Sequence, residues 1–152
     1  MPSFSELVGL PPLEEAIVGA VRLLVAAVAG GLLGAERESV GKAAGLRTHT
    51  LVAVAAALFV GVVDRAVEGD VSRVIQGVAA GIGFIGAGTI LKHADRERVT
   101  GLTTAANVWL TAAVGVAAGV GAIWLAMVAT LIGWVVLNVL SRVEGRGPRD
   151  AV

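Results

Sequence analysis

The stretch from Val74 to Leu91 reads VIQGVAAGIGFIGAGTIL and contains no charged residue over eighteen positions. An α-helix of this length extends over roughly 27 Å, close to the thickness of the hydrocarbon core of a bilayer. The sequence therefore predicts a transmembrane helix here. Glycines leave one side of that helix almost without side chains, so another helix can approach it closely. They are Gly77, Gly81, Gly83, Gly86 and Gly88. We therefore expect this helix to be the packing centre of the fold, and leucine at Gly81 or Gly83 to break the bundle.

The same residues match the glycine spacing of a dinucleotide-binding loop, from Gly81 to Gly86. That loop requires a preceding strand, a following helix and an acidic residue about 20 positions later. The preceding residues 74–80 have glycine and alanine where a buried strand would favour β-branched residues, and positions 100–102 contain no carboxylate. We therefore interpret the glycines as packing residues.

Composition indicates one membrane domain over residues 1–152. The chain is 56% hydrophobic, whereas soluble domains are about 45–50% apolar. Twelve basic and twelve acidic residues give zero net charge, so no basic face for nucleic acid is expected. Cysteine is absent, which excludes disulfides and thiol catalysis. We find no nucleophile beside a base and no phosphate-binding loop, so an enzyme is not expected.

The predicted fold is all-α, a polytopic bundle of five transmembrane helices in the lipid bilayer. Arg22 lies inside the first span, where we interpret it as an interface anchor. Residues 92–99 are predicted to form a charged loop. Glycine pairs four residues apart in three spans predict tight helix packing and leave a homodimer open. The predicted spans are residues 16–35, 47–63, 74–91, 100–120 and 122–140.

Lysine and arginine are distributed unequally between the two sides of these spans. Nine lie on one side, at positions 37, 42, 47, 92, 96, 98, 142, 146 and 149, and two lie on the other, at 65 and 73. Cytoplasmic loops carry the excess of positive charge. The N-terminus is therefore predicted outside and the C-terminus in the cytoplasm. Residues 1–15 contain no lysine or arginine, so they do not resemble a secretory signal peptide.

Polar residues within or beside the spans are the candidate functional groups. Hard cations such as Mg²⁺ prefer oxygen ligands, and Glu36, Gln76 and Asn107 are the candidates for such a site. Interhelical hydrogen bonds are the commoner role of these groups, and no span contains a carboxylate cluster. No cofactor is expected, although a bound Mg²⁺ ion remains an open alternative. We expect His49 to be a hydrogen-bonded residue at the membrane interface.

Four motifs, in order along the chain, resemble the MgtC/SapB family of membrane proteins, over about residues 22–140. They are Gly34-Ala-Glu36-Arg37-Glu38, Gly41-Lys42-Ala-Ala-Gly45-Leu46-Arg47-Thr48-His49, Gly81-Ile-Gly83-Phe84-Ile-Gly86-Ala87-Gly88, and Val99-Thr-Gly101-Leu102-Thr103-Thr104-Ala105-Ala106. The resemblance implies a small protein of the bacterial inner membrane, linked to growth in low magnesium, to virulence in some intracellular pathogens and to inhibition of the proton-translocating ATP synthase. Well-studied members also carry a soluble C-terminal domain, and this chain is expected to be a short form without it.

Two function classes are consistent with these observations. The first is a regulatory or interaction protein in magnesium homeostasis, which binds another membrane complex such as ATP synthase. The second is a transporter or channel for a cation, Mg²⁺ or H⁺. We favour the regulator, because five spans do not form an inverted repeat and no span carries the paired acids typical of coupled carriers.

Overall fold

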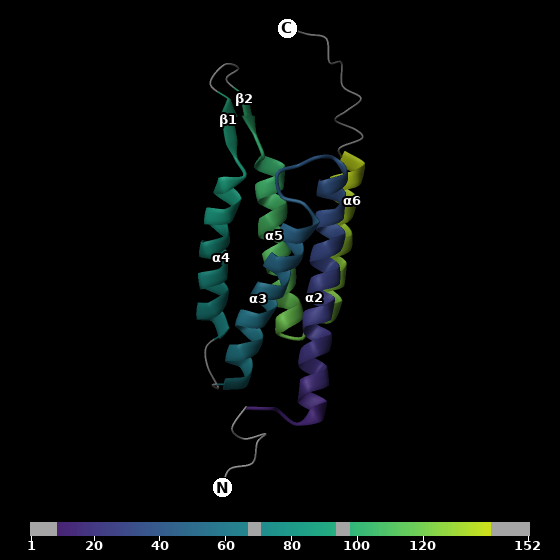
Figure 1. Ribbon diagram of the computed structural model, residues 1–152, viewed down its shortest axis with the longest axis vertical. Helices are drawn as coiled ribbons and strands as arrows, with labels where there is room; N and C mark the ends of the chain where they lie inside the picture. Colours follow the sequence, from purple (N-terminus) through teal and green to yellow (C-terminus); the bar gives the residue numbers. More distant parts are fainter. Residues whose placement is uncertain (1–8, 67–70, 94–97, 141–152) are drawn as a thin grey trace.

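The computed structural model describes residues 9–66, 71–93 and 98–140. Five helical segments run alternately in opposite directions and form an elongated bundle, with a short two-stranded hairpin at one end (Figure 1). The elements are α2 (Leu13–Ser39), α3 (Leu46–Ala66), α4 (Val71–Gly88), β1 (Leu91–His93), β2 (Arg98–Thr100), α5 (Leu102–Gly119), α6 (Ile123–Val135) and the π-helix η1 (Val136–Leu140).

The all-α membrane fold is confirmed. α2, α3, α4 and α5 are each long and apolar enough to cross a membrane, and α6 with η1 forms a shorter apolar segment. Residues 92–93 and 98–99 differ from the predicted loop, because Leu91 pairs with Thr100 and His93 pairs with Arg98 in two antiparallel strands. Positions 94–97 of that loop lie outside the described residues. Two basic positions used to predict the orientation, Lys92 and Arg98, therefore lie on the hairpin. Positions 96, 142, 146 and 149 lie outside the described residues.

The bundle core consists mainly of small residues from α2, α3, α5 and α6. In lipid, helices associate through close packing and hydrogen bonds, which favours alanine and glycine at their contacts. A Cβ atom at Gly30 would lie 2.6 Å from the carbonyl oxygen of His49, and one at Gly119 would lie 2.6 Å from that of Ala57. The predicted tight packing at Gly30 and Gly119 is thus confirmed. The main core cluster comprises Ala26, Ala29, Leu33, Ala53, Ala57, Val114, Ala118, Ala126 and Leu137.

The prediction that the glycine-rich helix is the packing centre is wrong. Only 11% of the α4 span is buried, against 50% of α5. A Cβ atom at Gly77, Gly81, Gly83 or Gly88 would meet no atom within 4 Å. Gly86 alone among the glycines of α4 approaches a neighbour, because its Cβ would lie 3.6 Å from Ala105 Cβ. Leucine at Gly81 or Gly83 would therefore project into open space instead of breaking the bundle.

Arg22 connects the first helix to the turn between α5 and α6. Its Nη1 donates a hydrogen bond of 2.9 Å to the carbonyl oxygen of Gly119. Gly121 in that turn has φ 87°, and a Cβ atom there would lie 2.7 Å from Arg22 Nη2. The guanidinium group therefore packs directly on the turn, so Arg22 does more than anchor the helix at an interface.

Arg22→Met should lower the free energy of unfolding by about 1 kcal/mol, the usual net value of one intramolecular hydrogen bond. The measurement is thermal unfolding of the purified protein in detergent. Arg47→Met removes an exposed arginine of α3 and is the matched control. An equal loss in both variants would show that the Gly119 contact contributes nothing.

Candidate functional site

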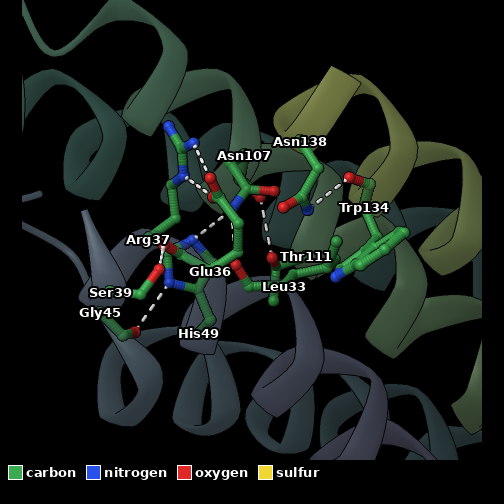
Figure 2. A network of polar contacts seen from close by, with 10 residues as sticks. All are labelled: Leu33, Glu36, Arg37, Ser39, Gly45, His49, Asn107, Thr111, Trp134 and Asn138. Carbon is green, nitrogen blue, oxygen red and sulfur yellow. Dashed lines mark hydrogen bonds and ion pairs between the residues drawn. The ribbon is translucent and has the colours of Figure 1, made fainter. Parts of the chain in front are cut away.

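A buried hydrogen-bond network connects α2, α3 and α5. Asn107 on α5 and His49 on α3 are 3% and 0% exposed. The Asn107 Nδ2 atom lies 2.8 Å from His49 Nε2 and 3.4 Å from the carbonyl oxygen of Leu33 on α2. Figure 2 shows the amide of Asn107 between these two groups. His49 Nδ1 in turn lies 2.9 Å from the carbonyl oxygen of Gly45. One amide therefore joins three helices.

These contacts assign the protonation state of His49. A carbonyl oxygen can only accept, so Nδ1 carries the proton and donates to Gly45. Nε2 then accepts from the Asn107 amide, which also donates to Leu33. The imidazole is therefore neutral, with both ring nitrogens paired. His49 is fully buried within the bundle, and the prediction that it is hydrogen-bonded is confirmed.

The remaining oxygen of the amide, Asn107 Oδ1, is buried and has no hydrogen-bond partner. A pocket of about 320 Å³ between α5 and α6 is lined by Asn107 and by Thr103, one turn earlier on α5. Buried polar atoms are nearly always paired, and an orphan acceptor marks a place for a donor such as water. Asn107 Oδ1 is therefore a buried acceptor that is available to an additional polar donor.

Charged residues at the end of α2 are engaged in internal contacts. Arg37 and Glu36 form a two-pronged ion pair, in which Arg37 Nε contacts Glu36 Oε2 and Nη2 lies 2.7 Å from Oε1. The Glu38 carboxylate accepts a 2.8 Å hydrogen bond from the backbone N–H of Leu46 and so caps the start of α3. A Cβ atom at Gly45 would lie 2.8 Å from that carboxylate. A larger residue at position 45 would therefore push the Glu38 carboxylate away from its place at the start of α3.

A polar cavity of about 620 Å³ lies at the same end of the bundle, between the end of α2, the start of α5 and η1. Gly101 precedes α5 with φ 93°, and a Cβ atom there would overlap the carbonyl oxygen of Thr89. No side chain caps this end of α5. Glycine therefore turns the chain sharply and leaves the helix start open. The lining residues are Glu36, Arg37, Val40, Lys42, Val99, Gly101, Leu102, Thr103, Thr104, Val136 and Leu137.

The predicted site residues separate into two groups. Glu36, Arg37, Thr103 and Thr104 line this cavity, and Thr103 also lines the smaller pocket beside Asn107. By contrast, Gln76 is exposed on α4 and shares no hydrogen bond with the other two candidate ligands. Across the described part of the chain, no group of three or more His, Cys, Asp and Glu residues is placed to hold a metal ion.

The sequence did not reveal that His49 lies at the centre of the buried hydrogen-bond network. The available signal was a histidine four residues after Gly45 on a helix whose later residues are apolar. Its partner Asn107 is 58 positions away, and no local pattern connects the two residues.

Comparison with known proteins finds relatives that cover most of this chain. SrpB of Synechococcus elongatus is 44% identical over 137 residues, which cover 81% of this chain and 75% of SrpB. YhiD of Escherichia coli K12, named "Putative magnesium transporter YhiD", is 40% identical over 83% of this chain and 62% of its own length. MgtC of Brucella abortus is 53% identical over 104 residues, 67% of this chain and 42% of that protein. No solved structure matches the chain.

The family comparison covers most of the bundle. Residues 23–146 match the sequence profile of the MgtC family. The matched range includes the helix ends that build the polar cavity and the buried network of Asn107 and His49. The protein is a multi-pass membrane protein that belongs to the MgtC family.

Proposed function

We propose that this protein serves magnesium homeostasis in the bacterial inner membrane by binding a transmembrane helix of another membrane protein. Its lysine- and arginine-rich end faces the cytoplasm in this proposal. The magnesium context is supported by the name of the relative YhiD and by membership of the MgtC family.

The observation that carries the proposal is the open glycine face of α4. Gly77 and Gly81 lie four residues apart on one wall of an apolar groove of about 650 Å³ between α3 and α4. Neither glycine has a neighbour within 4 Å of its Cβ position. Glycines at this spacing allow two helix backbones to approach closely in a membrane. The groove therefore suits a transmembrane helix.

The charged groups support an interaction protein over a cation carrier. Carriers tend to use acidic residues that are free to bind and release their ion. Here the Glu36 carboxylate is held on both oxygens by Arg37, and the Glu38 carboxylate caps α3. Both acids of the Glu36–Glu38 motif thus perform structural tasks.

A specific test uses ATP synthase, the partner implied by the family resemblance. Purified F-type ATP synthase reconstituted in liposomes with this protein should pump protons more slowly on ATP addition than the synthase alone. Gly81→Leu should abolish this inhibition because leucine fills the groove. Gly83→Leu should retain it, because Gly83 is equally open on α4 but does not line the groove.

Both variants should fold, since a Cβ atom at either position would meet no atom within 4 Å. If wild-type protein leaves proton pumping unchanged, or if the two variants behave alike, the groove is not the binding site for this partner.

The alternative is a cation transporter, and the observation that favours it is the unpaired Oδ1 of Asn107, a residue that lines the pocket between α5 and α6. Saturable Mg²⁺ or H⁺ flux into liposomes containing the protein alone would support transport. Glu36→Gln and Asn107→Ala would then abolish that flux. Flux equal to that of empty liposomes would leave the interaction protein as the better description.

A further inference from the structure

We propose that the polar cavity at the end of α2 is a binding site for a phosphate group. The cavity brings together two cationic side chains, the start of a helix and two hydroxyl groups. This site lies on α2, α5 and η1, so it does not depend on the groove between α3 and α4.

The electrostatics of the cavity favour an anion. Arg37 and Lys42 contribute two positive charges and Glu36 contributes one negative charge. The start of α5 adds a partial positive charge, because the first N–H groups of a helix have no partner within the helix. Its residues Leu102 to Thr104 line the cavity, and no side chain caps this end. Helix starts of this kind bind phosphate readily.

A second observation is the hydroxyl group of Thr104. This residue is 3% exposed and lines the cavity. Its Oγ1 forms no hydrogen bond with any described residue, and it is not among the fully enclosed atoms that lack a partner. The hydroxyl of a residue buried to this extent normally pairs with an acceptor. Phosphate oxygens would supply acceptors at this place, together with acceptors for the N–H groups of the first helical turn.

The ion pair leaves Arg37 able to bind a second anion. A guanidinium group carries five N–H donors, and Glu36 occupies Nε and one position on Nη2. The Nη1 group remains for another acceptor. Arg37 is only 4% exposed, so its charge is fixed in the cavity wall instead of moving in solvent. Glu36 thus acts to orient Arg37.

The phosphate group has two sources, an anionic phospholipid headgroup and a free phosphate compound. Apolar side chains beside the cavity are exposed, including Val40 at 52% and Leu102 at 59%. These side chains would contact the part of the acyl chains nearest the headgroup if the ligand is a lipid. Titration with inorganic phosphate and retention of phospholipids separate the two sources.

The test uses the full chain in a zwitterionic detergent. Inorganic phosphate is titrated at constant ionic strength against chloride while the Tm is followed, and native mass spectrometry compares phosphatidylglycerol with phosphatidylcholine. We expect saturable binding of one phosphate source. Stabilisation by inorganic phosphate without lipid identifies a free phosphate compound; retention of phosphatidylglycerol that phosphate does not displace identifies the lipid.

Lys42→Gln and Thr104→Val should each weaken this binding about tenfold, because each removes one hydrogen bond to a charged group. Arg47→Gln is the matched control, since it removes a cation near the same end that does not line the cavity. The proposal is overturned if neither phosphate nor phosphatidylglycerol binds in a saturable way. Equal weakening by Lys42→Gln and Arg47→Gln would also overturn it, because it would indicate only a diffuse charge effect.

Discussion

Gly115→Val should prevent the bundle from assembling, and this is the largest effect of a single substitution that we expect. A Cβ atom at Gly115 would overlap the carbonyl oxygen of Ala53, and it would also lie 2.9 Å from the Ala53 Cα. The obstructing atoms belong to the backbone of α3, so no rotamer change can relieve the overlap. The cost should reach or exceed about 3 kcal/mol, the upper end for overpacking a core.

The measurement is the amount of monodisperse protein recovered in detergent, followed by thermal unfolding of what remains. Gly83→Val is the matched control, because it adds the same side chain to a glycine without a neighbour within 4 Å. We expect Gly83→Val to behave like the wild type. Normal recovery and Tm for Gly115→Val would show that α3 and α5 do not pack as closely as described.

This contrast explains why the helices were predicted better than their packing. Length, apolar character and charge distribution indicate spans because the bilayer imposes those properties on each segment separately. A glycine shows only that a helix surface is flat. Gly81, in the most glycine-rich span, faces open space, while Gly115, in a span with fewer glycines, meets the backbone of α3. Which neighbour covers a flat surface depends on tertiary structure.

Only part of the candidate site could be predicted, because the contacts of its residues also depend on tertiary structure. The motifs around Glu36, Gly45 and Gly101 were visible in the sequence, and the structure places all three at one end of the bundle. Their separate tasks, an ion pair, a helix cap and a sharp turn, depend on where α2, α3 and α5 end relative to one another. Gln76 was grouped with Asn107 as an intramembrane amide, yet it is exposed whereas Asn107 is buried. Residue type alone does not distinguish these positions.

His49→Leu should be the second most damaging substitution, with a loss of about 2–3 kcal/mol in the free energy of unfolding. Leucine removes the 2.8 Å contact between His49 Nε2 and Asn107 Nδ2. Asn107 would then retain only its 3.4 Å hydrogen bond to Leu33, with Oδ1 still unpaired. Burial of a polar amide costs free energy unless hydrogen bonds replace its contacts with water. One long hydrogen bond would compensate only a small part of that cost.

A double-mutant cycle measures whether the two side chains form one unit. Asn107→Leu alone leaves His49 Nε2 buried without a donor and should cost about 1–3 kcal/mol. In the double variant His49→Leu/Asn107→Leu neither polar group remains, so the double variant should lose less free energy of unfolding than the sum of the two single losses.

Thr130→Val is the control. It removes a buried hydroxyl that bonds only the Ala126 carbonyl oxygen of its own helix. Its loss of free energy of unfolding should add to that of either single variant. Additive losses for His49 and Asn107 would show that their contact does not connect α3 to α5. A non-additive result would establish the amide of Asn107 as a polar connection between α3 and α5.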